Sequence, residues 1–85
     1  MFYVYILILS NKQLYTGYTS DLKRRVKEHK CGKVKFTSKR LPVKLIYYEA
    51  YISQIDARKR EKYLKTSDGK AQIKIMLKDF LSNID

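Results

Sequence analysis

An 85-residue chain has room for one domain, over residues 1–85, with a modest hydrophobic core. Nineteen Lys and Arg residues against eight Asp and Glu give a net charge of +11, which predicts a polyanionic partner such as DNA, although a solvated lysine surface would give the same charge. The single cysteine excludes an internal disulfide framework and a CxxC metal site. The apolar segment MFYVYILIL is too short to span a bilayer and follows no basic segment, so we expect a cytoplasmic protein with no membrane anchor.

The predicted elements follow the order β-β-α-β-α-α along the chain. Aromatic and β-branched residues dominate the predicted strands, and the turn segment SNKQ joins the first two. The segment TSD supplies capping side chains before the first helix, Gly32 follows its end, and Ser53 stands at the cap of the second helix. In chain order we predict strands over 2–9 and 14–18, a helix over 21–30, a basic loop over 33–43, a strand over 44–51, and helices over 54–65 and 70–82.

This order predicts an α/β (α+β) fold, in which a small three-stranded antiparallel or mixed sheet is flanked by helices. The last helix has apolar residues at the i, i+3, i+4, i+7 spacing of a buried stripe. We expect the whole stripe to be core, namely Ile73, Met76, Leu77, Phe80, Leu81 and Ile84.

The first two strands form a hairpin whose register follows from its loop. A three-residue loop at 10–12 places Gly17 opposite Tyr5, with Tyr15 diagonal to it, whereas a slip of one residue would place Tyr18 there. A glycine beside Tyr5 predicts open space in which the backbone of a ligand could approach.

The helix over 21–30 carries two polar residues on its apolar face. Successive helix residues turn by about 100°, so Arg25 and His29 lie on the same side as Leu22 and Val26, which must face the sheet. His29 alone could be a core-edge imidazole with a backbone partner. A guanidinium is expensive to bury unpaired, so Arg25 is expected to pair with a carboxylate or to bind a phosphate.

The second helix repeats this pattern with the opposite charge. Glu61 shares a face with Ala57 and Leu64, while the basic residues of this helix point outward. An inward carboxylate is expected either to pair with Arg25 or to bind a hard divalent cation, and the pattern does not choose between them.

These residues together resemble the GIY-YIG nuclease superfamily, above all its small stand-alone bacterial members. The resemblance rests on YVY at 3–5, YTG at 15–17, Arg25, His29 and Glu61, and it covers nearly the whole chain. It implies a three-stranded sheet flanked by helices, one divalent cation site, and hydrolysis of a DNA phosphodiester. The chain departs from the family pattern at Tyr3, which replaces the first motif glycine, and at Thr16, which replaces an isoleucine.

The resemblance also implies roles for individual residues. Tyr5 and Tyr15 match the two motif tyrosines, Arg25 the catalytic arginine, and His29 a histidine of some branches, so these four are the predicted catalytic residues. Glu61 matches the metal-binding glutamate and would hold one Mg²⁺ or Mn²⁺ ion. We expect the DNA to be bound by Gly17 and Tyr18 and by the basic loop, through Lys33, Lys35, Lys39 and Arg40.

The function predicted from the sequence is a metal-dependent endonuclease that cuts DNA with structure selectivity or weak sequence selectivity. A tyrosine can act as its base only if its pKa, ordinarily about 10, is lowered, and we expect the cation and the guanidinium to lower it. Two alternatives are a non-catalytic nucleic-acid-binding module with this fold and a subunit whose last helix docks a partner protein.

Overall fold

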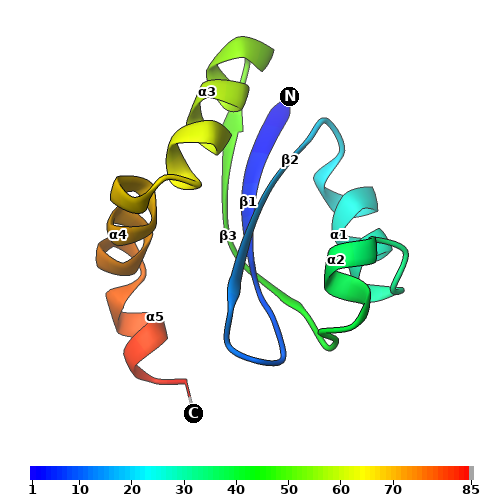
Figure 1. Cartoon of the computed structure of the whole chain (residues 1–85). Coiled ribbons are helices and arrows are strands. Elements are labelled where there is room, and N and C mark those ends of the chain that lie inside the picture. The colour runs from blue at the N-terminus through cyan, green and yellow to red at the C-terminus, as the bar shows by residue number, and fades with distance from the viewer. Residues whose placement is uncertain (85) are drawn as a thin grey trace.

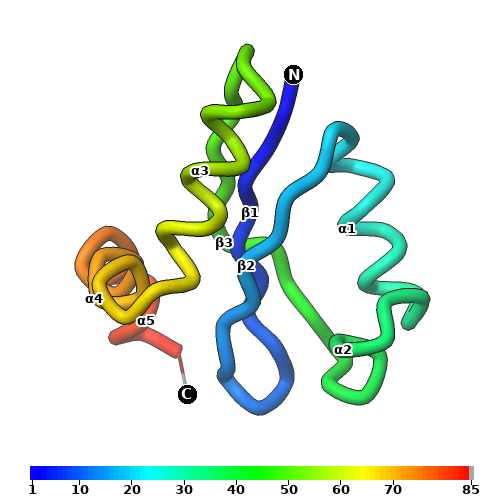
Figure 2. The backbone as a smooth tube through the Cα atoms, turned by 45° about the horizontal axis from the view of Figure 1, so that its top comes forward, coloured from blue at the N-terminus to red at the C-terminus, as the bar shows by residue number. Residues whose placement is uncertain are grey.

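The computed structural model describes residues 1–84, which form a three-stranded antiparallel sheet with helices on both faces (Figure 1). Helices α1 and α2 cover one face, and α3 and α4 cover the other, so that the strands lie between two helical layers (Figure 2). None of the helices over residues 1–84 is long and apolar enough to cross a bilayer. The elements are β1 (Phe2–Ile8), β2 (Leu14–Thr19), α1 (Leu22–Lys30), α2 (Lys35–Ser38), β3 (Lys44–Tyr51), α3 (Gln54–Leu64), α4 (Ser67–Met76) and α5 (Lys78–Ser82).

Strand β1 is the centre of the sheet, and the strand order is β2-β1-β3. The three-residue hairpin loop closes with a hydrogen bond from Leu9 N to Gln13 O of 2.9 Å. This loop sets Tyr5 opposite Gly17, as the sequence predicts, and both neighbours of β1 run antiparallel to it. Strand β2 is therefore an edge strand, with one helical layer on each side of it.

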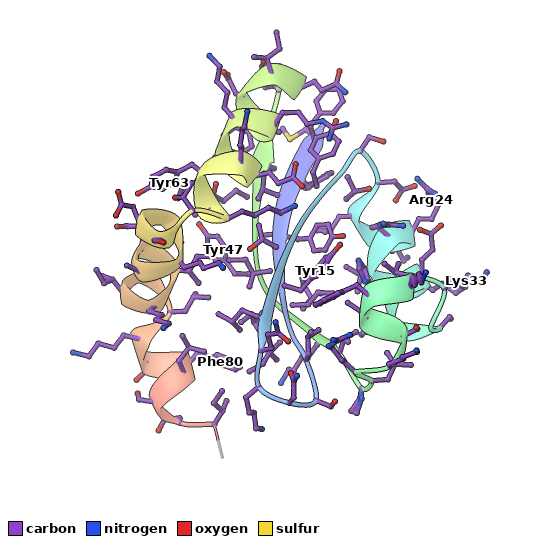
Figure 3. All side chains as sticks on the ribbon, viewed as in Figure 1. Tyr15, Arg24, Lys33, Tyr47, Tyr63 and Phe80 are labelled. Atoms are coloured by element: carbon purple, nitrogen blue, oxygen red, sulfur yellow. The ribbon has the colours of Figure 1, made fainter. Side chains whose placement is uncertain are left out.

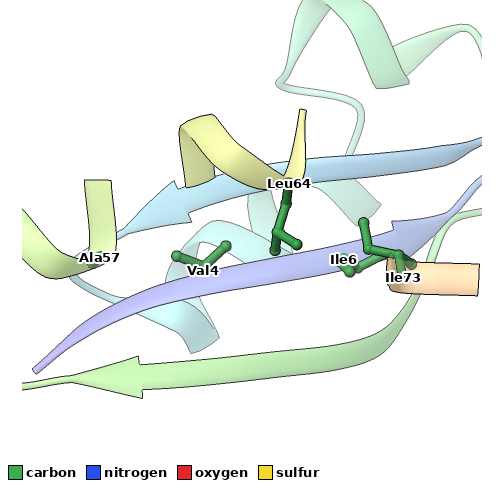
Figure 4. Packing of buried hydrophobic residues seen from close by; sticks show 5 residues of the cluster. All are labelled: Val4, Ile6, Ala57, Leu64 and Ile73. Atoms are coloured by element: carbon green, nitrogen blue, oxygen red, sulfur yellow. The ribbon is translucent and has the colours of Figure 1, made fainter. Parts of the chain in front are cut away.

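Side chains of β1 alternate between two small cores because successive strand residues point to opposite faces. Val4 and Ile6 point toward α3 and α4, where they pack on Ala57, Leu64 and Ile73 (Figure 4). The next cluster lies on the α1 and α2 face of the sheet and consists of Tyr5, Leu7, Leu9 and Val43. The buried tyrosine of this second cluster is one of the predicted catalytic residues.

The helices begin where polar side chains cap them. Asp21 accepts a hydrogen bond from Arg24 N at the start of α1, and Ser53 accepts one from Asp56 N at the start of α3. Thr66 caps α4 in the same way, so this helix begins at Ser67, before the predicted start at residue 70. Glycine is required in that first turn, because a Cβ on Gly69 would collide with the backbone of α3.

Two predictions about the helices are wrong. Residues 35–38 form the short helix α2 within the segment predicted to be a loop, and the last predicted helix is divided at Leu77 into α4 and α5. The chain changes direction at Leu77, and from there the apolar stripe lies at the margin of the core: Leu77 packs on the edge of the cluster around Ile73, and Phe80 and Ile84 lie beside the end of β1. Ile73 is buried as expected, whereas Met76, Leu77, Phe80, Leu81 and Ile84 are only partly buried.

Candidate active site at the edge of strand β2

The ring of Tyr5 lies across Gly17 on the neighbouring strand. A Cβ atom on Gly17 would collide with the outer end of this ring, including its hydroxyl oxygen. The expectation of open space for a ligand at Gly17 is therefore wrong, because the Tyr5 side chain fills it. Glycine instead lets the Tyr5 hydroxyl reach past the backbone of the edge strand.

A buried chain of hydrogen bonds begins at this hydroxyl. Tyr5 Oη lies 2.8 Å from His29 Nε2, and His29 Nδ1 lies 2.8 Å from Thr37 Oγ1. The Thr37 hydroxyl in turn donates to the Val34 carbonyl oxygen at 3.4 Å. If its only proton is used there, Nδ1 must donate to Thr37, and Nε2 is left to accept the proton of Tyr5. His29 thus has side-chain partners rather than the backbone partner considered from the sequence.

Tyr5 and His29, the first two groups of this hydrogen-bonded series, are uncharged near pH 7. Burial, together with the charges of Tyr15 and Glu61, raises the pKa of Tyr5 to about 12, although Arg25 acts in the opposite direction. Burial and then the charge of Arg25 lower the pKa of His29 to about 4. As expected, the Arg25 guanidinium acts to lower the pKa of Tyr5. Burial raises this pKa by more, so the expected net lowering does not occur.

Arg25 reaches the same region from α1 and is held by a neighbour on its own helix. Its Nη1 donates to Glu28 Oε1 at 3.0 Å, and Glu28 also accepts from Arg24 Nη1 at 3.1 Å. Arg25 is therefore not the partner of Glu61, which removes one of the two alternatives left open by the sequence. The Arg25 side chain remains 36% exposed, so a phosphate can approach it.

Glu61 lies on α3, in the helical layer on the other side of β2. Its side chain is only 17% exposed, and Lys65 Nζ donates to its Oε2 at 3.0 Å. Helix α3 packs against β1 and β2, so the carboxylate lies in the layer next to the edge strand, on the face opposite to Tyr5 and His29.

A divalent cation fits this carboxylate only with ligands from outside the protein. Among residues 1–84 there is no group of three or more His, Cys, Asp and Glu side chains that could hold a metal ion. Mg²⁺ commonly keeps several waters and binds one or two carboxylates together with phosphate oxygens. A single, mostly buried carboxylate such as Glu61 suits that mode of binding and does not suit a cation that needs a full set of protein ligands.

Tyr15 and α2 form an aromatic wall beside this cluster. The Tyr15 ring centroid lies 5.1 Å from that of His29 and 5.7 Å from that of Phe36, and the Arg40 guanidinium covers Phe36 at 4.1 Å. Figure 3 shows Tyr15 on the side of β2 that faces α1 and α2. Phe36 and Thr37 were not found from the sequence, where the only available signal was their place in a basic segment after the His29 helix.

The remaining predicted DNA-binding residues are spread over more than one face. Lys33, Lys35 and Lys39 are exposed around α2, and Figure 3 shows Lys33 on the outer side of its layer, away from Tyr15. Tyr18 points to the opposite face of the sheet from Tyr5, where the Arg58 guanidinium covers its ring at 4.0 Å. Neither group is brought to the Tyr5 hydroxyl, so their contact with DNA stays a prediction.

A second polar cluster, absent from the sequence analysis, lies between β3 and α3. Glu49 accepts hydrogen bonds from Tyr47 Oη at 2.6 Å, from Tyr51 Oη, and from Arg60 Nε and Nη2 at 3.0 Å each. Alternation along β3 places these two tyrosines and the carboxylate on one face, but the arginine comes from another element. All its members are paired with one another, as expected of a structural cluster.

Comparison with known proteins places these features in context. The model of the GIY-YIG catalytic domain matches residues 1–74. A UPF0213 protein of Streptococcus agalactiae serotype V is 46% identical over 72 residues, which cover 84% of this chain and 82% of that protein. A UPF0213 protein of Streptococcus pyogenes serotype M5 is 45% identical over 71 residues, or 82% of this chain and 77% of that protein. The solution structure of a UPF0213 protein from Bacillus halodurans is similar with a TM-score of 0.57 and 38% identity, covering 89% of this chain and 85% of that one.

Proposed function

This chain belongs to the GIY-YIG family, and from that membership we propose that it is a metal-dependent endonuclease that hydrolyses DNA phosphodiester bonds. The observation that supports the proposal is the hydrogen bond of 2.8 Å between Tyr5 and His29, on the helix that also carries Arg25, while Glu61 lies on the helix that packs on the other face of the sheet. A phosphate lying along the edge strand β2 would contact both sides. The net charge of +11 favours DNA as the partner, and we place the reaction in the cytoplasm.

Tyr5 is the proposed proton relay, because it has a proton acceptor, His29, behind it. When a water molecule transfers a proton to Tyr5 Oη, the hydroxyl proton of Tyr5 passes to His29 Nε2, 2.8 Å away. The resulting hydroxide attacks phosphorus as the bond to the leaving oxygen breaks, and the departing oxygen takes up a proton from solvent. Tyr5 is neutral before and after this transfer, so a pKa of about 12 is compatible with its relaying the proton, and His29 is the group that accepts it. His29, whose pKa is about 4, readily gives the proton up afterwards.

Arg25 and a cation held by Glu61 would compensate the negative charge of the phosphate. Arg25 can turn from Glu28 to the phosphate, where its guanidinium stabilises the negative charge that grows on the non-bridging oxygens. Glu61 would hold Mg²⁺ or Mn²⁺, which when bound supplies Lewis-acid chemistry at the phosphoryl and leaving oxygens. For that role the carboxylate must exchange the ammonium of Lys65 for the cation.

A cleavage panel tests this function. Labelled branched, nicked, single-stranded and duplex DNA are incubated with the protein in Mg²⁺, in Mn²⁺ and in EDTA. We expect cleavage of at least one substrate with either metal and none in EDTA, and we expect Glu61→Gln to bind DNA without cutting it. The matched control is Lys62→Gln on the exposed side of α3, which should cut as the unmodified protein does. Binding with no cleavage in any arm would instead indicate a non-catalytic nucleic-acid-binding module.

A further inference from the structure

A groove of about 610 Å³ runs along β2 from the candidate active site toward the hairpin turn. Its floor is the edge strand, and its two walls come from α2 and from the junction of α3 and α4, which lie on opposite sides of β2 in Figure 1. The side chains that define it are Lys12, Tyr15, Phe36, Lys65, Lys70 and Lys74. We call this feature the β2 groove.

The β2 groove is continuous with the candidate active site. Tyr15 belongs to both, since its ring lies 5.1 Å from the ring of His29 and also lines the groove. Lys65, which also lines the groove, is the residue that binds the Glu61 carboxylate at 3.0 Å. A DNA strand whose scissile phosphate lies between Arg25 and Glu61 would therefore place its neighbouring nucleotides in this groove.

The charge of the groove suits phosphates. Four lysines line it and no acidic residue does. Among the ion pairs within residues 1–84, only Lys65 of these four takes part. Lys70 and Lys74 are one helical turn apart on α4, so their ammonium groups can follow successive phosphates.

The floor and one wall suit nucleobases rather than a paired helix. Phe36 is 43% exposed, and its ring stacks against Tyr15 with an interplanar angle of 28°. Because the Arg40 guanidinium covers the Phe36 ring at 4.1 Å, a base that stacks there takes the place of this guanidinium or lies on it. In a duplex the bases are stacked on one another and only their edges are presented, so a duplex has no base face to place on an aromatic wall. An unpaired base has a free face, and stacking on aromatic side chains is how sequence-tolerant single-strand sites hold it.

We infer that the β2 groove binds unpaired nucleotides of DNA next to the scissile phosphate, with a base against Phe36 and Tyr15 and phosphates on the lysines. This inference rests on the proposed function, because it takes the strand that is cut between Arg25 and Glu61. A larger groove of about 750 Å³ between α1 and β3 is no part of it, since Asp21 lines that groove and no candidate active-site residue does.

The first test places a fluorescent reporter in the groove. The chain contains no tryptophan, so Phe36→Trp places a single tryptophan at the proposed stacking position, and it is excited at a wavelength that the eight tyrosines do not absorb. It is titrated in EDTA, where no cleavage is expected, with the single strand dT15 and with a blunt 15-base-pair duplex. We expect dT15 to quench the emission to saturation and the duplex to leave it nearly unchanged. The control is Ile55→Trp, at an exposed position outside the groove, which neither DNA should quench.

Two outcomes of this titration would overturn the inference. The first is no quenching by dT15, and the second is equal quenching by the duplex, which would assign the groove to paired DNA. Phe36→Ala gives an independent check, because loss of base stacking should weaken dT15 binding by about 5- to 150-fold. Its circular dichroism melt is recorded alongside, since Phe36 also packs on Tyr15.

The second test concerns the lysines. Lys70→Ala with Lys74→Ala removes two positive charges from the groove, and Lys59→Ala with Lys62→Ala removes two from exposed positions of α3 outside it. For dT15, each phosphate contact contributes about −0.7 to the slope of log affinity against log salt, so the groove pair should reduce the slope by about 1.4. The α3 pair should leave the slope nearly unchanged, and equal reductions would overturn the inference.

These readouts separate the inference from the proposed function. Both are made without cleavage, so quenching of Phe36→Trp in a protein that cuts no DNA would overturn the nuclease proposal and support the groove. Metal-dependent cleavage by a protein whose Phe36→Trp emission does not respond to dT15 would support the nuclease proposal and overturn the groove inference.

Discussion

The hydroxyl oxygen of Tyr5 and Nε2 of His29 lie 2.8 Å apart, and both side chains are buried. Burial moves their pKa values in opposite directions, to about 12 for Tyr5 and about 4 for His29, so the shared proton stays on the tyrosine near pH 7. The other ring nitrogen of His29 is held by Thr37 at 2.8 Å. Thr37 is therefore the residue that decides which nitrogen of His29 is free to accept from Tyr5.

The protonation of His29 can be measured without any activity, because it is the only histidine in the chain. We expect its ¹⁵N spectrum to show the neutral Nδ1–H tautomer at pH 7 and no protonation until the pH approaches 4. Thr37→Val removes the acceptor of Nδ1–H and should increase the Nε2–H tautomer, and Thr37→Ser should restore the original spectrum. An Nε2–H tautomer in the unmodified protein, or titration near pH 6.5, would contradict this prediction.

Gly17 is expected to be intolerant of any side chain, because the Tyr5 ring occupies the space of its Cβ. Gly17→Ala should lower the free energy of unfolding by about 1–3 kcal/mol, as overpacking does, and urea denaturation measures this. In a Tyr5→Leu background the ring is gone, so the same glycine substitution should cost clearly less. Equal costs in the two backgrounds would show that Gly17 does not serve the Tyr5 ring.

Local periodicity explains which parts of the site could be predicted from the sequence. The three-residue hairpin loop and the alternation of strand residues fix Gly17 opposite Tyr5, and the 100° helical step places Arg25 and His29 on one face. Each of these relationships depends on spacing within a single hairpin or helix. The same holds for the inward placement of Glu61 on α3.

Features that depend on volume or on distant partners could not be predicted in this way. Helix α2 has four residues and no side-chain cap, so no periodic pattern marked Thr37 as a buried partner of His29. Gly17 was read as open space because the sequence does not show where the Tyr5 ring lies. Leu77 fits a buried stripe by spacing and does pack on the edge of the core, but it is only partly buried because the chain turns at that residue.

Arg25 and Arg24 form a matched pair for testing the site, because both bind Glu28. Only Arg25 also acts on the pKa of Tyr5, whereas Arg24 is 60% exposed and points outward in Figure 3. Arg25→Ala should reduce the cleavage rate by about 100-fold or more, the effect of removing a donor that stabilises transition-state charge. Arg24→Ala should change the rate little. Neither should change stability by more than about 1 kcal/mol, since these ion pairs reach solvent.

Unfolding of Arg25→Ala under conditions where Arg24→Ala stays folded would identify Arg25 as a structural ion-pair partner. Circular dichroism and cleavage are therefore measured on the same two samples. Equal loss of cleavage in both variants would mean that only the net charge of α1 matters.

The Glu49 cluster predicts how stability depends on pH. Burial raises the pKa of Glu49, but the hydrogen bonds from Arg60, Tyr47 and Tyr51 outweigh it and hold the pKa below its ordinary value of 4.5. A carboxyl group whose pKa is lower in the folded state stabilises the fold above the unfolded pKa, and this contribution is lost as the pH falls through the folded pKa. We therefore expect the free energy of unfolding, measured with urea, to fall below about pH 4.5.

Glu49→Gln keeps the size of the side chain but removes the negative charge of the carboxylate, whose two oxygens accept hydrogen bonds from Arg60. At pH 7 it should lower the free energy of unfolding by about 1.5–3 kcal/mol, because hydrogen bonds to a charged group are lost. Below the folded pKa of Glu49 the difference from the unmodified protein should shrink, since the side chain at position 49 is then uncharged in both proteins. Glu28→Gln is the control, because its pKa is also lowered, by Arg25, but the pair reaches solvent and is screened. If Glu49→Gln lowers the free energy of unfolding by the same amount at pH 7 and pH 3, the charge of Glu49 does not stabilise this fold.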